Sequence, residues 1–148
     1  MSFNDLSNYN LPVEYTAEFT VPHFARKEGR GVVIRPSLFP AKMLEQYGSL
    51  AERRHDLLLE FPRVRDEKVI FELPAGWKAK SLPQSIDRDS PLGSFSFKAK
   101  ADGNKIEVDS SFKLKTARIP KGDYKAWRDF AGEIDRAQDE EIVIEPEK

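Results

Sequence analysis

The side chains of this chain that could do chemistry are few and lie far apart. Only two histidines occur: His23 follows a proline, and His55 lies in the stretch Arg-Arg-His-Asp. Neither histidine has a third ligand at a spacing typical of metal sites, such as a His-Glu-x-x-His pair on a helix. Cysteine is absent, which removes thiol nucleophiles, disulfides and thiolate metal ligands. We therefore predict no catalytic residue, no metal site and no cofactor site.

Serines and carboxylates give no stronger signal. The stretch Gly93-Ser94-Phe95-Ser96 lacks the second glycine of the Gly-x-Ser-x-Gly turn of many hydrolases, and its serines fit the outward face of a strand. Paired carboxylates could cleave sugars, but with 25 acidic residues some will lie close together by chance. Gly29-Arg30-Gly31 is too short for a phosphate-binding loop and lacks its Gly-Lys-Ser/Thr ending.

The two tryptophans are the remaining candidates for a binding surface. Trp127 recurs at helical spacing with other aromatic residues, which favours core packing over a groove lining. Trp77 directly follows a Pro-Ala-Gly turn, and both core packing and an exposed aromatic platform stay open for it. Trp77 is therefore the one residue that we assign to a candidate binding surface.

Size and charge narrow the class of protein. A chain of 148 residues fits one domain with a sizeable core. Its 24 Lys and Arg residues nearly balance its 25 Asp and Glu residues, and the signs are interspersed, so no strong field steers nucleic acid or an anionic membrane. The first residues show no signal peptide, and no apolar run approaches membrane-spanning length. We expect no nucleic-acid partner and no membrane insertion.

The N-terminal half contains short predicted elements between prolines and glycines. Residues 13–21 alternate apolar and polar side chains, which predicts a strand that Pro22 ends. Further along, we expect a polar turn at 26–31, a short strand at 32–34, a helical turn near 40–47 and a strand at 57–61. Residues 1–12 are expected to be flexible.

The central block alternates most regularly, from Glu67 to Leu114. A strand containing Val69, Phe71 and Leu73 ends at a Pro-Ala-Gly turn, and an irregular connection follows at 82–93. Two longer strands then meet at Asp102-Gly103, because these residues tolerate the positive φ of tight hairpin turns. A one-residue slip would expose the apolar face of the second strand, so its register should be firmly set.

After residue 120 the apolar period changes from 2 to 3.6. Asp123 is the expected N-cap of a helix over about 123–137, and a short strand is expected at 141–144. The apolar stripe of this helix consists of Tyr124, Trp127, Phe130, Ala131 and Ile134. We expect one mainly β domain over residues 1–148, a sandwich of about seven or eight strands closed by the C-terminal helix.

Several stretches in order resemble one family pattern. They are Arg53-Arg54 before a Leu-rich strand, Glu72-Leu73-Pro74-Ala75-Gly76-Trp77 (similar to "elPeGy"), Ser81-Leu82-Pro83 ("eLP"), Ser90-Pro91-Leu92-Gly93-Ser94-Phe95 ("spfGsys"), Gly103-Asn104-Lys105-Ile106, and Ile119-Pro120-Lys121-Gly122-Asp123-Tyr124 ("ip-x-x-dY"). Together they resemble the domain of unknown function that follows the transglutaminase-like domain (papain-type cysteine protease superfamily) in many bacterial proteins. The resemblance covers about residues 53–145, and the first fifty residues fit it loosely.

The resemblance implies an Ig-like antiparallel β-sandwich with one C-terminal helix. It also implies a non-catalytic accessory domain, with a structural or interaction role beside a transglutaminase-like catalytic domain of the parent protein. The catalytic Cys, His and Asp of such enzymes belong to that other domain, and none of their motifs maps here. Family members are often exported, so the resemblance suggests the bacterial cell envelope or periplasm. The alternative function is a free-standing module that binds carbohydrate or protein. An enzyme in its own right would need a deep pocket that brings His55 and carboxylates together.

Overall fold

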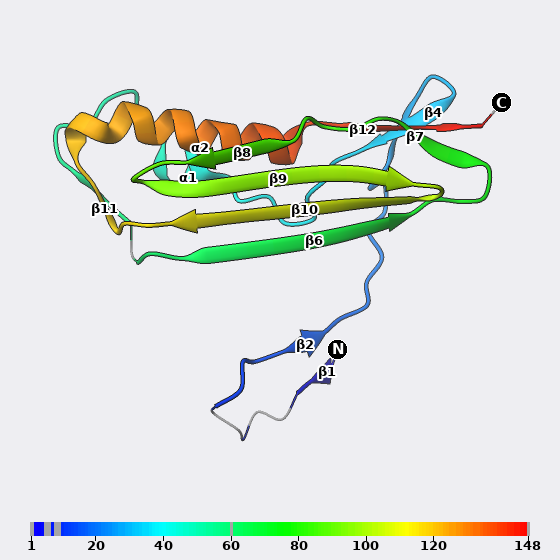
Figure 1. Ribbon diagram of the computed structural model, residues 1–148, viewed down its shortest axis with the longest axis horizontal. Helices are drawn as coiled ribbons and strands as arrows, with labels where there is room; N and C mark the ends of the chain where they lie inside the picture. The colour runs from blue at the N-terminus through cyan, green and yellow to red at the C-terminus, as the bar shows by residue number, and fades with distance from the viewer. Residues whose placement is uncertain (1, 5–6, 8–9, 60, 148) are drawn as a thin grey trace.

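The computed structural model describes residues 2–4, 7, 10–59 and 61–147. The protein is mainly β, with several antiparallel sheets and one long helix near the C-terminus, as expected from the sequence. The main sheet has four strands in the order β6-β10-β9-β8, with the bounds β6 Val64–Glu72, β8 Ile86–Asp89, β9 Gly93–Asp102 and β10 Lys105–Leu114. Figure 1 shows its three long strands running side by side along the body.

The hairpin of β9 and β10 has the register that its alternation requires. Phe112 lies opposite Phe95 and both side chains are buried, while Asp109 lies opposite Lys98 on the outward face. Asp102 lies opposite Lys105, so the two-residue turn consists of Gly103 and Asn104, one residue later than expected. Gly103 has a φ of 56°, a left-handed conformation that glycine adopts without steric cost.

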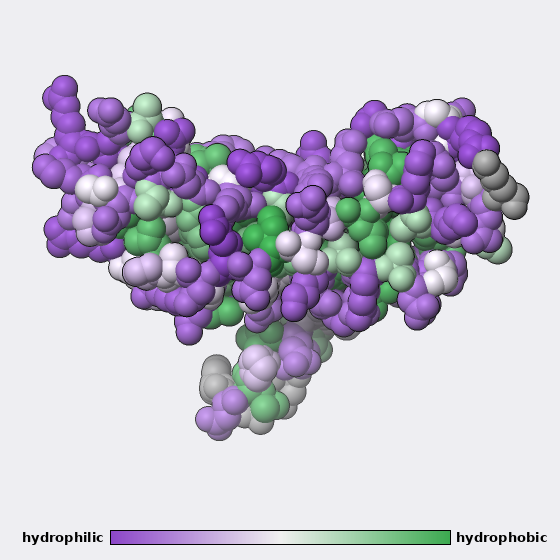
Figure 2. All heavy atoms as spheres, turned by 45° about the horizontal axis from the view of Figure 1, so that its top comes forward, coloured by the Kyte–Doolittle hydropathy of each residue, from purple (hydrophilic) through white to green (hydrophobic). Residues whose placement is uncertain are grey.

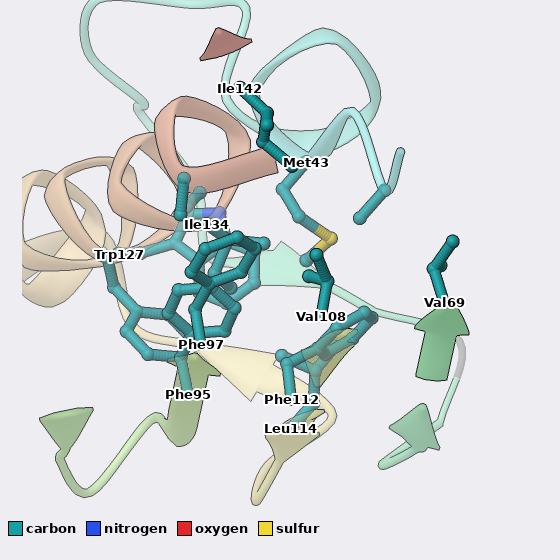
Figure 3. Packing of buried hydrophobic residues seen from close by; sticks show 14 of the residues in the cluster. Met43, Val69, Phe95, Phe97, Val108, Phe112, Leu114, Trp127, Ile134 and Ile142 are labelled. Carbon is teal, nitrogen blue, oxygen red and sulfur yellow. The ribbon is translucent and has the colours of Figure 1, made fainter. Parts of the chain in front are cut away.

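Helix α2 (Tyr124–Asp139) covers part of the inner face of this sheet. Trp127 and Ile134 are fully buried, and Figure 3 shows them packed above Phe95 and Phe97. The predicted stripe is therefore core. The residue before the helix is Asp123, as expected, but its side chain makes no capping hydrogen bond. Its backbone is helical, not extended, because residues 121–123 form a 3₁₀ turn that leads into α2.

The predicted helical turn near 40–47 is observed as α1, Met43–Tyr47. It begins after Lys42, whose φ of 50° is left-handed, and it has no side-chain cap of its own. The carboxylate of Asp135 in α2 takes this role, because it accepts the backbone N–H of Met43 at 2.7 Å and that of Leu44 at 2.8 Å. The contact fixes α1 against α2.

A second four-stranded antiparallel sheet lies beyond the C-terminal end of α2 (Figure 1). Its order is β3-β4-β12-β7, with the bounds β3 Arg26–Glu28, β4 Gly31–Ile34, β7 Trp77–Ser81 and β12 Ile142–Pro146. The strands predicted at 32–34 and 141–144 are thus observed. The polar turn predicted over 26–31 was too long, because β3 pairs with β4 and only Gly29 and Arg30 lie between them.

Two other predictions need correction. The connection over 82–93 was expected to be irregular but contains β8, which pairs with β9 along its whole length. Its alternation was hidden because Ile86 is its only apolar residue. The strand predicted at 57–61 is observed only as β5, Leu57–Leu58, which pairs with β11, Arg118–Ile119. Residue 60 lies outside the described residues.

The strand predicted over residues 13–21 is largely absent. Only β2, Tyr15–Thr16, is a strand, and it pairs with β1, Ser2–Phe3. Figures 1 and 2 show this hairpin below the body, with hydrophobic residues on its surface. The exposed apolar residues of the run are Val13, Tyr15, Phe19 and Val21. Residues 13–21 do alternate apolar and polar side chains, but no sheet in the described part of the chain covers the apolar side chains of this segment. Of the residues expected to be flexible, 1, 5–6 and 8–9 lie outside the described residues.

Candidate functional site

An apolar groove of about 510 Å³ lies between the end of β6 and the second sheet. Its lining comes from segments far apart in sequence: Phe24, Ala25, Val32, Ile34, Ile70, Phe71, Glu72, Leu73, Pro74, Trp77 and Ile144. Most of these side chains are aliphatic or aromatic, and Glu72 is the only charged residue among them. A hollow of this composition suits an apolar side chain of a partner better than an ionic ligand.

Trp77, the candidate from the sequence, lies in this groove. The turn before it is closed by its backbone N–H, which donates to the carbonyl of Pro74 at 3.1 Å. Gly76 within the turn has a φ of 77°, which a residue with a Cβ rarely adopts. This turn starts β7 and leaves the indole half-buried, with one part against the core and one part facing the groove.

Two phenylalanines complete the aromatic lining. Phe24 stacks on Phe71 with their ring centroids 6.1 Å apart and their planes at 24°. The sequence did not assign these residues to a site. Phe71 was expected to be core because of its period-2 spacing, and Phe24 lies outside every predicted element. A fold was needed to bring residue 24 next to residue 71.

The charges around the groove are already paired. Glu72 is 2.9 Å from the ammonium group of Lys105 on the neighbouring strand. Glu145 follows the lining residue Ile144, and Lys80 donates to its carboxylate at 2.7 Å. This hydrogen bond holds the pKa of Glu145 below its ordinary value. Both carboxylates are thus engaged by lysine side chains of neighbouring strands.

His55 lies in a different hollow, with Arg54, Asp56 and Arg118 among its neighbours. The carboxylate of Asp56 accepts the backbone N–H of Lys121 at 2.8 Å and the Nε–H of Arg118 at 2.8 Å. The backbone hydrogen bond, followed by that from Arg118, lowers the pKa of Asp56. One carboxylate therefore lies near His55, and its oxygens are engaged in holding the local fold.

His23 lines a third hollow with Arg26 and Glu141, and the two histidines are not brought together. Ser94 and Ser96 lie in β9 opposite Lys113 and Ser111 of β10, on the outward face of the main sheet. Across residues 2–4, 7, 10–59 and 61–147, no group of three or more His, Asp or Glu side chains could hold a metal ion. Over the same residues, no helix is both long and apolar enough to cross a membrane.

Comparison with known proteins identifies the family. Residues 30–144 match the family described as "Domain of Unknown Function with solved-structure structure (DUF3858)". The chain belongs to this family. The matched range includes the helix α2, most of the groove lining and both four-stranded sheets except β3 and the last two residues of β12. It begins after Phe24. No curated protein matches the chain.

A solved structure shares the fold of this DUF3858 domain. It is the crystal structure of a "putative protease" from Parabacteroides distasonis ATCC 8503, with a TM-score of 0.63 and 16% sequence identity. The alignment covers 77% of this chain and 23% of the chain of that protein. The domain thus spans less than a quarter of the solved chain that it matches, and at this identity the likeness concerns the fold alone.

Proposed function

We propose that this DUF3858 domain is a non-catalytic accessory domain that packs against a transglutaminase-like catalytic domain and orients it or its partners. The apolar groove around Trp77 is the observation that carries this proposal, because it is an uncovered hydrophobic surface with a defined shape. The likeness to less than a quarter of a larger chain described as a putative protease supports the same role.

The arrangement of polar groups also favours a non-catalytic role. The two histidines lie in separate hollows, and Asp56, which lines the same hollow as His55, accepts hydrogen bonds from Arg118 and Lys121. Catalysis by proton transfer needs a donor or acceptor within reach of a bound substrate. The groove around Trp77 offers mainly carbon atoms.

The proposed fold is the Ig-like sandwich that the family resemblance implies. Two four-stranded antiparallel sheets in one body are consistent with it. The proposed compartment, the bacterial cell envelope, rests on the resemblance alone.

The alternative proposal is a free-standing binding module, and the half-buried indole of Trp77 is the observation in its favour. Sugar-binding sites combine an aromatic platform with several polar groups, since each buried hydroxyl needs a partner. Glu72 is the one charged residue that lines the groove, and Lys105 pairs with it. The groove therefore suits an apolar protein surface better than a glycan.

The non-catalytic role can be tested with the purified chain in transglutaminase and protease assays, using a glutamine-containing peptide with an amine donor and an unfolded protein substrate. We expect no turnover above buffer. Turnover that a single substitution such as His55→Ala abolishes would contradict the proposal.

The interaction role can be tested by titrating the chain with a purified transglutaminase-like domain encoded in the same genome, using calorimetry. We expect Trp77→Ala to weaken binding about tenfold or more, because aromatic residues at the centre of interfaces dominate affinity. Leu58→Ala, at an exposed apolar residue outside the groove, should leave the affinity unchanged. Equal affinities of all three proteins would exclude the groove as the contact, and a glycan that binds the wild type but not Trp77→Ala would support the alternative.

A further inference from the structure

Strand β6 forms an open edge of the main sheet. Within the described residues it pairs with β10 alone. The Leu114 N–H donates to the Arg63 carbonyl, and the Leu73 N–H donates to the Asn104 carbonyl, both at 2.8 Å. Backbone groups alternate in direction along a strand, so the odd-numbered residues of β6 face β10 and its even-numbered residues face outward. Among the described residues, the backbone groups of the even-numbered residues of β6 thus have no partner strand, and they leave donors and acceptors along one side.

Apolar side chains are held next to this edge. The carboxylate of Glu67 accepts the backbone N–H groups of Leu38 and Phe39, at 3.1 and 3.3 Å, and the hydroxyl of Ser37 at 2.7 Å. Arg65 donates to the Phe39 carbonyl. These bonds fix the loop of residues 37–39 against β6, yet Phe39 remains 60% exposed. A strand added at the edge of β6 would cover Phe39 and Leu38.

The chain contains a segment that matches this edge. Residues 13–21 have the same length as β6, and their odd positions are apolar while Glu14, Thr16, Glu18 and Thr20 alternate with them. Phe19 is 62% and Val13 is 71% exposed. Added to β6 with its apolar side chains inward, the segment would face Phe39 and Leu38 on one side. Its acidic residues would lie on the outward face, where β6 presents Lys68 between Asp66 and Glu72.

The position of Phe24 disfavours antiparallel pairing of the segment with β6 of its own molecule. The Phe24 ring stacks on Phe71, near the C-terminal end of β6. An antiparallel strand would place Val21 at the other end of β6, near Arg65, about 20 Å from Phe71. The three residues from 21 to 24 reach about 10 Å when fully extended. All strand pairs of the described chain are antiparallel, so a second copy supplies the segment in the geometry that this fold uses.

The β6 edges of two copies do not suit each other. In the centred antiparallel register, Lys68 of one copy lies directly opposite Lys68 of the other. Like charges in directly opposed positions are unfavourable, and lysine on an edge strand commonly prevents such pairing. Lys68 already pairs with Glu107 at 2.8 Å and with Asp109 at 3.7 Å. An incoming strand with a glutamate at this position avoids the contact between two lysines and adds one more acceptor for Lys68.

We propose that two copies of this chain exchange strands, with residues 13–21 of each copy pairing antiparallel to the free edge of β6 in the other. The register that places Glu18 opposite Lys68 also places Tyr15 opposite Phe71 and Ala17 opposite Val69. In the exchanged dimer, β2 no longer pairs with β1. The backbone groups of the even-numbered residues in the segment bond to β6 of the other copy instead. Glu14 then faces Glu72, whose charge Lys105 neutralises.

Cysteine crosslinking tests the contact directly, since the chain has no cysteine of its own. Two full-length single variants, Glu18→Cys and Lys68→Cys, are given tags of different mass, mixed and oxidised. We expect a disulfide-linked heterodimer as the main product. A mixture of Leu58→Cys with Lys68→Cys is the matched control and should yield little heterodimer. Equal yields in both mixtures would overturn the proposal, as would a monomeric intramolecular disulfide as the main product of the double variant Glu18→Cys/Lys68→Cys.

Sedimentation velocity of the full chain over a wide concentration range is the second test. We expect a monomer–dimer equilibrium in the wild type. Phe19→Lys should raise the dimer dissociation constant by about a hundredfold, because each dimer contains two copies of Phe19. Leu58→Lys, which places the same charge at another exposed apolar residue, should leave the equilibrium unchanged. A monomer at all concentrations, or a dimer that Phe19→Lys does not weaken, would overturn the proposal.

Discussion

Two segments of this chain alternate apolar and polar residues in the same way, but only one of them buries its apolar side chains. In β10, Ile106, Val108 and Phe112 are almost fully buried. In residues 13–21, the apolar side chains at 13, 15, 19 and 21 are exposed, and only two residues form a strand. The pattern alone states which side chains share a face, and a second layer decides whether that face is buried.

The layer over β10 is supplied by local and distant parts of the chain. β9 and β6 pair with β10 on its two sides, and α2 places Trp127 and Ile134 above the inner face (Figure 3). Residues 13–21 have β1 as their partner strand within the described residues. Strand exchange with a second copy is the arrangement that would give this segment a sheet and an apolar layer.

Because β10 buries its apolar side chains and residues 13–21 leave most of theirs exposed, replacing phenylalanine by alanine should change the free energy of unfolding by different amounts in the two regions. Phe112→Ala should lower the free energy of unfolding by about 3–5 kcal/mol, because it removes a buried ring and leaves a cavity. Phe19→Ala should change it by less than about 0.5 kcal/mol in dilute protein, because this ring is exposed. Urea unfolding followed by circular dichroism measures both. Similar losses in the free energy of unfolding for the two variants would contradict this difference between the regions.

Gly93 in β9 tests how closely the main sheet is packed at this position. A Cβ added at Gly93 would lie 2.5 Å from the Lys113 carbonyl oxygen and 3.1 Å from the Phe130 ring of α2. Gly93→Ala should therefore lower the free energy of unfolding by about 1–3 kcal/mol. Gly122→Ala is the control, since nothing lies within 4 Å of its added Cβ. If urea unfolding finds the two variants equally stable, neither β10 nor α2 approaches Gly93 as closely as described.

The link between α1 and α2 should make a smaller contribution. Asp135→Ala leaves the N–H groups of Met43 and Leu44 without their acceptor, so we expect a loss of about 1–2 kcal/mol. Thermal unfolding monitored by calorimetry measures the loss. Asp129→Ala removes an exposed carboxylate of the same helix and should have little effect. A neutral Asp135→Ala would show that α1 is held by its other contacts, such as the burial of Met43 and the hydrogen bond from Arg128 to the Gly48 carbonyl.

The outward face of the sheet should contribute a pH dependence. Hydrogen bonds from Lys68 and then from Lys100 lower the pKa of Glu107 from 4.5 to about 2. A lowered pKa in the folded state stabilises the fold above the unfolded pKa, so this contribution is full above about pH 5 and is lost as pH falls from about 4.5 towards 2. Urea unfolding of wild type and Glu107→Gln across this range measures it. A difference between the two proteins that does not shrink as the pH falls would contradict this assignment.

The sequence predicted the parts of the fold that depend on local pattern. The hairpin around Gly103, the helix over Tyr124–Asp139 and the burial of its Trp127 stripe follow from period and turn chemistry. The failures have physical causes. β8 was missed because Ile86 is its one apolar residue, and the strand over 13–21 was overpredicted because alternation carries no information about a covering layer.

The candidate site was only partly accessible from sequence. Trp77 could be singled out because the turn before it leaves a large aromatic residue at the start of a strand. Phe24 and Phe71 could not, since they are 47 positions apart in sequence and meet only in the folded chain. Likewise, the open edge of β6 is a property of strand order, which alternation does not specify.

The central claim is that an alternating segment forms a stable strand only where another layer covers its apolar face. Hydrogen exchange measured by mass spectrometry at several protein concentrations tests this claim most directly. Peptides from Lys105–Leu114 should be strongly protected at every concentration. Peptides from residues 13–21 should exchange rapidly in dilute protein and become protected as the concentration rises, together with peptides from β6. Strong protection of residues 13–21 in dilute, monomeric protein would contradict the account, as would a lack of protection when the dimer is populated.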